Sequence, residues 1–257
     1  MKKKEGFVEI EGYAYHYQTI GEYHGNNPFI IFLHEGLGSI PQWKDFPEKL
    51  CQATGMPGFL YERHGYGRST PPAKERSKDF LQAEAMILPH ILEKLNLKSP
   101  HYVFGHSDGA TIALLYASCQ PKNLKSLVAE APHVFLEEQS VRGIARTKEA
   151  FQKGTLKGLE NYHGFHTGNV VLSWTNYWLD PANRDWNMFD ELKKITAPVL
   201  FIQGTKDMFG TLQQGEEIRK RIKGPYQNMV LEKCGHTPHF EKQKKVIDAI
   251  TEFFDKN

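Results

Sequence analysis

Cysteine is scarce in this chain, and the few copies show no spacing that would bind a metal or build a disulfide framework. The three cysteines, Cys51, Cys119 and Cys234, are scattered and odd in number. Small secreted domains that depend on disulfides carry many cysteines at short intervals. The sequence therefore favours a reducing compartment, and we expect a cytoplasmic protein.

An excess of charge of one sign is also lacking. Lysine and arginine together number 32 and aspartate and glutamate 30, which gives a formal net charge of +2. This charge is too small to indicate a nucleic-acid partner. No apolar run approaches the length of a membrane span, and the basic start Met1–Lys4 leads into Glu5 and Glu9 instead of an apolar signal segment. We expect no nucleic-acid partner, no membrane, and a monomer or homodimer that acts on a small molecule.

Short apolar segments alternate with stretches of helical periodicity over most of the chain. An opening β-hairpin is expected at Phe7–Ile10 and Ala14–Thr19, and further strands at Pro28–Leu33, Gly58–Tyr61, His101–Phe104, Lys125–Ala129, Pro198–Ile202 and Gln227–Leu231. Strands that alternate with helices form parallel sheets with right-handed crossovers. The sequence therefore predicts an α/β fold with a mostly parallel eight-stranded sheet flanked by helices.

The alternation stops between residues 135 and 192. This stretch is helical in pattern and rich in aromatic residues, which include Trp174, Trp178 and Trp186. We interpret it as a helical cap inserted after the sixth strand, with residues 1–134 and 193–257 forming the core. The cap would roof the site, so Trp174 and Trp178 are expected to bind substrate, and the aromatic lining favours a mostly apolar acyl or aromatic group.

The segment Gly105-His106-Ser107-Asp108-Gly109 lies between a predicted buried strand and an apolar helix. A strand that turns into a helix through G-x-S-x-G is the context of a nucleophile elbow. The turn is tight, so the residues beside the serine must be small, and Gly105 and Gly109 meet that requirement. The pattern predicts that Ser107 presents its hydroxyl above the edge of the sheet.

A serine hydroxyl needs a neighbouring base to take its proton, and that base needs a carboxylate to orient it. His236 and Asp207 each follow a predicted strand, where functional residues collect in open α/β sheets. Glu130 also follows a strand and is the alternative acid. The order Ser107, Asp207, His236 is that of the α/β-hydrolase triad.

These motifs resemble the α/β-hydrolase fold over nearly the whole chain. The matching features are the loop at His34, Gly65–Ser69, the elbow, the cap position, Gly204–Asp207 and Gly235-His236. The resemblance implies that Ser107 is the nucleophile, His236 the general base and then acid, and Asp207 the orienting acid.

The resemblance also implies an oxyanion hole built from two backbone N–H groups. One is expected from Asp108 and the other from Gly36, with Leu37 as the alternative donor. The family loop usually reads His-Gly-x-x-Gly, whereas Glu35 stands at the usual glycine here. His34 is expected to brace this loop beside the substrate.

Other histidines and acidic residues show no metal-binding spacing, and no glycine loop that could cradle a phosphate follows a strand. We therefore expect no metal and no cofactor. His163 and His166 in the cap are expected to be exposed.

The activity implied by the resemblance is cleavage of a small or medium carboxylic ester through an acyl-enzyme. A carbon–carbon bond hydrolase of the meta-cleavage-product type is the alternative, although Thr237 follows the base where that branch often has tryptophan. Cofactor-free haloperoxidase or perhydrolase activity is a further alternative. A ligand receptor on a hydrolase scaffold is the alternative outside enzymes.

Overall fold

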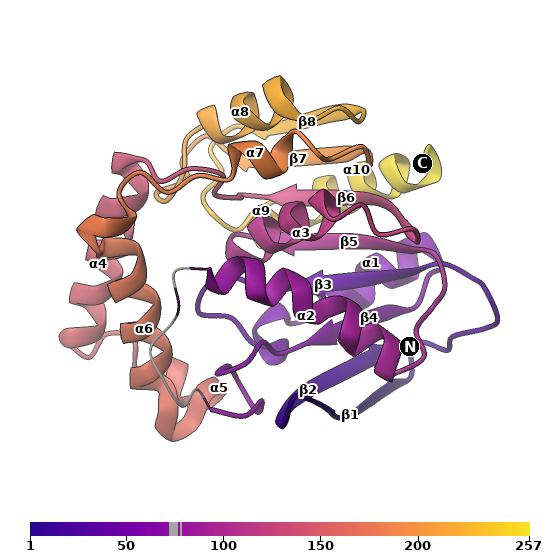
Figure 1. Ribbon diagram of the computed structural model, residues 1–257, viewed down its shortest axis with the longest axis horizontal. Coiled ribbons are helices and arrows are strands. Elements are labelled where there is room, and N and C mark those ends of the chain that lie inside the picture. Colours follow the sequence, from indigo (N-terminus) through magenta and orange to yellow (C-terminus); the bar gives the residue numbers. More distant parts are fainter. Residues whose placement is uncertain (72–76, 78) are drawn as a thin grey trace.

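An eight-stranded sheet runs through the middle of the protein in the order β1-β2-β4-β3-β5-β6-β7-β8 (Figure 1). The structure is a computed structural model that describes residues 1–71, 77 and 79–257. The strands are β1 (Lys3–Ile10), β2 (Tyr13–Ile20), β3 (Phe29–Leu33), β4 (Gly58–Tyr61), β5 (His101–His106), β6 (Leu124–Glu130), β7 (Val199–Gly204) and β8 (Tyr226–Leu231). β2 pairs antiparallel with β1 and β4, and all other pairs are parallel. The predicted fold class is confirmed.

The central strands are continuous apolar segments because both faces of the sheet are covered. Every residue of β3, β4, β5 and β7 is buried, as expected for parallel strands between two helical layers. β1 begins four residues earlier than predicted. Its first residues are mostly charged and exposed at the edge of the sheet, so they lack the apolar pattern by which the other strands were identified. Backbone pairing with β2, from Lys3 opposite Ile20 onward, sets its length there.

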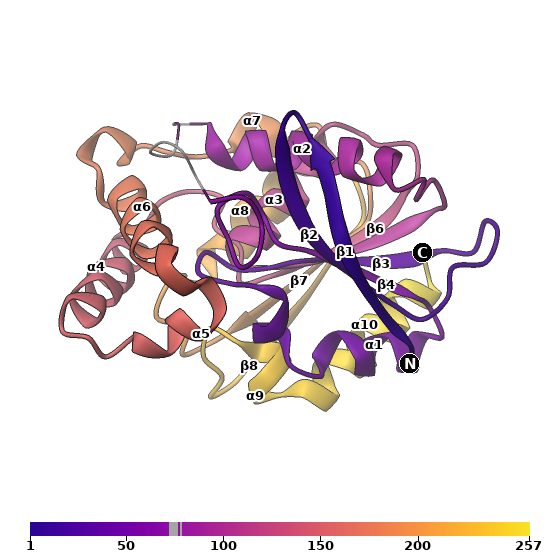
Figure 2. The same ribbon diagram turned by 90° about the horizontal axis from the view of Figure 1, so that it is seen from below.

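Two layers of helices cover the sheet. Helices α2 (Phe80–Lys94), α3 (Asp108–Ser118) and α8 (Gln213–Arg221) lie on one face, and α1 (Phe46–Thr54) and α10 (Gln243–Asp255) lie on the other (Figure 2). The sequence pattern alone favours one helix over Trp43–Ala53 and one over Phe240–Phe254. Instead, each is two pieces: the 3-10 helix η1 (Ile40–Trp43) precedes α1, and the short α9 (Pro238–Glu241) precedes α10. Lys44, with a φ of 52°, cannot continue the first helix.

The chain between β6 and β7 forms helices beyond the carboxyl ends of the central strands. They are α4 (Glu138–Gln152), η2 (Lys157–Leu159), α5 (Glu160–His163), η3 (Gly164–His166), α6 (Thr167–Leu179), η4 (Pro181–Asn183) and α7 (Phe189–Leu192). α4 packs on α6 at one end of the molecule, while α7 contacts α3 and α8 (Figure 1). The end of the predicted cap therefore lies against the helical layer of the sheet. None of the helices in the described residues is long and apolar enough to cross a membrane.

Candidate active site

Ser107 lies in a strained turn between β5 and α3. Its φ of 55° and ψ of −121° are unusual for a residue with a side chain. A Cβ on Gly105 would lie 2.3 Å from the carbonyl oxygen of Gly109, and one on Gly109 would lie 2.0 Å from that of Leu33. Close backbone approach on both sides therefore requires glycine, as the elbow pattern predicted. The Ser107 N–H donates to the Glu130 carbonyl at 2.8 Å, which anchors the turn to β6.

The structure brings together the three residues expected to form a triad. His236 Nε2 lies 2.9 Å from Ser107 Oγ, and His236 Nδ1 lies 2.7 Å from Asp207 Oδ2. Burial alone would raise the pKa of Asp207, but the charge and hydrogen bond of His236 outweigh it and lower that pKa. An ionised Asp207 accepts a hydrogen bond from the Nδ1–H group of His236, which leaves Nε2 unprotonated and able to take the serine proton.

Asp207 is held by neighbours other than His236. Gln203 Nε2 donates to Asp207 Oδ2 at 2.6 Å, and the Phe209 N–H donates to Oδ1 at 2.8 Å. The Phe209 ring lies 4.7 Å from the imidazole of His236. These contacts fix which carboxylate oxygen faces the base.

Glu130, the alternative acid, points away from this line. Its Oε1 contacts Nδ1 of His239 in a buried pair. His106, Glu130 and His239 are buried and offer ligand atoms within 4.8 Å of one another, a grouping that sequence spacing does not reveal. Glu130 and His239 contact each other directly within this group.

The two residues expected to form the oxyanion hole, Asp108 and Gly36, lie under one cap side chain. Trp174 Nε1 donates to Asp108 Oδ2 at 3.0 Å, and Arg63 Nη1 lies 4.0 Å from the same oxygen. A Cβ on Gly36 would lie 2.2 Å from Trp174 Nε1. The indole of Trp174 therefore rests on both residues beside the nucleophile, whereas its contact with substrate stays a prediction.

His34 and Trp178, which were predicted from the sequence to lie beside the substrate, are both buried. His34 Nε2 accepts from the Arg63 N–H at 3.2 Å and Nδ1 donates to the Glu35 carbonyl at 2.9 Å, so it braces the loop. Burial lowers the pKa of His34 well below its ordinary value, which keeps the ring neutral. Trp178 packs in an aromatic cluster with Phe80, Tyr177 and Trp186. A role in substrate binding for either residue stays a prediction.

Two cap histidines contradict the sequence-based expectation of exposure. His163 is 1% exposed and His166 is 7% exposed, because the end of the α5 segment packs on the loop after β3 and on the turn after β4. The apolar pattern of this short segment is too weak to reveal that contact from sequence.

His106 and His133 lie beside His236, and sequence reasoning assigned neither a role. His106 Nε2 donates to the His236 carbonyl at 2.8 Å, and its Nδ1 lies 3.8 Å from Glu35 Oε2. Burial would lower the pKa of His106, but Glu35 and Glu130 raise it to about 9. The His133 ring is stacked at 6.2 Å from that of His236. The pairing of His106 with Glu35 was not predicted from the sequence, and Glu35 at the usual glycine position was the one unusual residue that marked the place.

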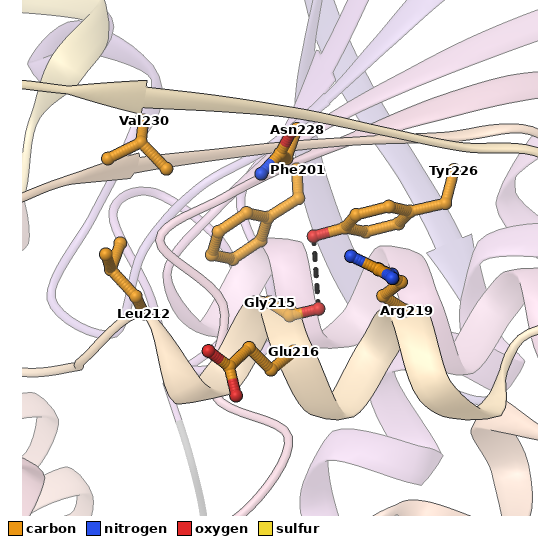
Figure 3. Close-up of a pocket in the computed structure, with 8 residues that line it drawn as sticks. All are labelled: Phe201, Leu212, Gly215, Glu216, Arg219, Tyr226, Asn228 and Val230. Atoms are coloured by element: carbon orange, nitrogen blue, oxygen red, sulfur yellow. Dashed lines mark hydrogen bonds between the residues drawn. The ribbon is translucent and has the colours of Figure 1, made fainter.

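A separate hollow of about 180 Å³ lies between α8 and the β7–β8 edge of the sheet (Figure 3). Phe201, Tyr226 and Arg219 are among its lining residues, and the Tyr226 hydroxyl donates to the Gly215 carbonyl at 3.0 Å. Its lining contains none of the expected triad residues, so it is distinct from the site around Ser107.

A proline iminopeptidase of Lactobacillus helveticus (strain DPC 4571) is 23% identical over an alignment 292 residues long, gaps included. The alignment covers 98% of this chain and 98% of that protein. The serine hydrolase BPHL of Homo sapiens is 24% identical over 230 residues, which cover 84% of this chain and 75% of that protein.

Among solved structures, the enol-lactonase from Burkholderia xenovorans LB400 has a TM-score of 0.78 at 16% identity, covering 98% of this chain and 100% of that chain. At this identity the likeness shows the fold. The family model described as alpha/beta hydrolase fold matches residues 28–191, which is more than half of the sequence. The chain belongs to the alpha/beta hydrolase fold family.

Proposed function

We propose that the chain is a serine hydrolase that cleaves a carboxylic ester of small or medium size through an acyl-enzyme. The observation that carries the proposal is the continuous hydrogen-bonded line from Asp207 through His236 to Ser107. A buried carboxylate, an imidazole in the matching tautomer and a hydroxyl within reach are what nucleophilic catalysis by serine requires.

The proposed reaction begins when Ser107 Oγ attacks the ester carbonyl carbon and His236 Nε2 takes the hydroxyl proton. The carbonyl oxygen becomes an oxyanion that accepts hydrogen bonds from the N–H groups of Asp108 and Gly36. Collapse of this intermediate breaks the ester bond, and His236 gives its proton to the departing alkoxide. Water then attacks the acyl-enzyme with His236 again as base, which releases the acid and restores Ser107.

A second candidate is hydrolysis of an amide bond next to a free amino group. Several relatives are named proline iminopeptidase, and a carboxylate follows the nucleophile here. Asp108 is fully buried, and within the described residues its Oδ1 has no hydrogen-bond partner. Trp174 and Arg63 face Oδ2, whereas Oδ1 is a buried acceptor without a partner in the described part of the chain, which is costly, so this oxygen suits a substrate ammonium group.

One panel of substrates tests the proposal and separates the candidates. It contains p-nitrophenyl acyl esters of increasing length, prolyl p-nitroanilide and a meta-cleavage dienoate, each assayed with the wild type and with Ser107→Ala. We expect a burst of p-nitrophenol from the esters and a loss of up to about 10⁶-fold in kcat for Ser107→Ala. A fluorophosphonate should add mass at Ser107 alone. Retained ester turnover in a pure, folded Ser107→Ala protein would refute the nucleophile, and turnover of the anilide alone would favour the second candidate.

A further inference from the structure

Three successive carbonyl groups in the loop after β3 each accept a hydrogen bond from a buried side chain. Glu35 O accepts from Arg63 Nη2 at 2.6 Å, Gly36 O from the Tyr66 hydroxyl at 2.9 Å, and Leu37 O from His163 Nε2 at 3.0 Å. We call Arg63, Tyr66 and His163 the carbonyl clamp. Two come from the turn after β4, and the third comes from α5, about 100 residues later in the chain.

The clamp fixes the direction of the amide groups that this loop offers to the site. The C=O of one residue and the N–H of the next lie in one rigid plane and point in opposite directions. A fixed Glu35 carbonyl therefore fixes the Gly36 N–H, and a fixed Gly36 carbonyl fixes the Leu37 N–H. These N–H groups are the two candidate donors to the oxyanion, so the clamp orients whichever one is used.

The clamp is itself rigid because its members pack on one another out of contact with water. Arg63, Tyr66 and His163 are each 1% exposed. The Arg63 guanidinium lies 4.4 Å from the centre of the Tyr66 ring, and the His34 ring meets that ring edge-on at 5.0 Å. Arg63 also reaches Asp108, the expected source of the other donor. One connected cluster thus contacts both halves of the expected oxyanion hole.

His163 ties the cap to this cluster in one defined tautomer. Its Nδ1 faces the Gly67 N–H at 3.0 Å and must accept, so Nε2 carries the proton that goes to the Leu37 carbonyl. Burial lowers the pKa of His163, which keeps the ring neutral and both bonds intact near neutral pH. A shift of the cap segment that carries His163 would therefore also shift the loop after β3.

We propose that Tyr66 and His163 are positioning residues for the oxyanion hole: Tyr66 fixes the Leu37 N–H through the Gly36 carbonyl, and His163 holds Leu37 from its other side, through the Leu37 carbonyl. This inference rests on the proposed serine hydrolase function. Effective oxyanion stabilisation needs donors that are already aimed before charge develops, since reorientation during the reaction would cost free energy. The Gly65–Ser69 turn supplies Tyr66 to the clamp, in addition to the bonds by which Ser69 joins the turn to β2 and to the residue that follows β4.

Tyr66→Phe is the sharpest test because it removes one hydroxyl and keeps the ring. Tyr61→Phe is the matched control: Tyr61 is equally buried, and its hydroxyl has no hydrogen-bond partner within the described residues. We expect Tyr66→Phe to lower kcat about 10-fold with little change in KM, less than the roughly 100- to 1,000-fold loss on deleting an oxyanion donor. The affinity for phenylboronic acid, which forms a tetrahedral adduct on serine, should fall in parallel. Tyr61→Phe should change neither value.

His163 is tested by a pair of variants with the same readouts. His163→Leu should lower kcat and boronate affinity together, and His163→Gln, whose amide can reach the Leu37 carbonyl, should restore part of both. If Ser107→Ala is inactive while Tyr66→Phe matches Tyr61→Phe in kcat and boronate affinity, the clamp has no positioning role and the hydrolase proposal stands. If Ser107→Ala retains turnover, the hydrolase proposal itself fails.

Discussion

Replacing Asp207 by asparagine should disable the site through the tautomer of His236. The new amide has one acceptor and one donor where the carboxylate had two acceptors. The Phe209 N–H, which donates to Oδ1 at 2.8 Å, is backbone and cannot reverse. An amide NH2 placed against it would leave that buried N–H unsatisfied, at a cost of about 1–3 kcal/mol. The amide oxygen should therefore stay at Phe209 and the NH2 should face His236.

The surroundings of Asp207 accept this orientation. Gln203 Nε2 donates to the other carboxylate oxygen at 2.6 Å, and within the described residues Gln203 Oε1 has no partner. A rotation of the Gln203 amide would let Oε1 accept from the new NH2 group, at the cost of the longer bond from Gln203 Nε2 to the Gly210 carbonyl at 3.3 Å. His236 Nδ1 must then accept as well, which moves its proton to Nε2 and prevents it from taking the Ser107 proton. The expected loss in kcat is about 10⁴-fold, or roughly 5.5 kcal/mol of transition-state stabilisation.

The assay compares kcat for a p-nitrophenyl ester in Asp207→Asn and in Glu130→Gln. Glu130→Gln is the control because it alters another buried carboxylate that follows a neighbouring strand but contacts His239 instead of His236. It should cost far less activity, and circular dichroism should show that both variants are folded. The opposite order of damage would mean that Glu130 is the orienting acid and would refute this reasoning.

Further predictions concern the cap and the ion pair between Glu35 and His106. Trp174→Ala should change the ranking of acyl chain lengths, because it removes the indole over Gly36 and its bond to Asp108; an unchanged ranking would exclude Trp174 as a pocket wall. Trp178→Ala should lower the free energy of unfolding by about 3–5 kcal/mol in urea titrations, and a neutral result would contradict its packing role. Glu35→Gln should destabilise the protein most between pH 4.5 and 6.5. In the folded protein the pKa of Glu35 is lowered from 4.5 to about 2 and that of His106 is raised from 6.5 to about 9, so the pair contributes its full stability above the ordinary pKa of Glu35 and below that of His106. The difference in free energy of unfolding should shrink as pH rises through about 9 or falls through about 2, and a pH-independent difference would argue against the ion pair.

The sequence was sufficient for features that depend on neighbours along the chain. Buried parallel strands such as Phe29–Leu33 show as unbroken apolar runs, and Ser107 and Asp207 each follow a fully buried strand, whereas His236 follows the largely exposed edge strand Tyr226–Leu231. The parallel sheet brings those strand ends to one edge, which is why the three residues could be predicted to meet. The break at Lys44 was not visible, because it depends on a backbone conformation that no local pattern marks.

Contacts between distant segments were beyond sequence reasoning. The burial of His163 depends on how a short cap helix packs on the loop after β3, and both of its ring nitrogens bind backbone groups. Backbone partners leave no pattern in side-chain composition. The pairing of Glu35 with His106 was equally hidden, although the unusual glutamate marked the position.

The indole of Trp174 has a kinetic consequence beyond its shape. It rests on both residues beside the nucleophile, and Ser107 is only 3% exposed. We expect a substrate to displace the Trp174 side chain before it reaches Ser107. Admission of the substrate is then a separate step before chemistry, and such steps limit turnover in many enzymes. Turnover should therefore slow as solvent viscosity increases, and a variant with a smaller side chain at position 174 should lose that dependence.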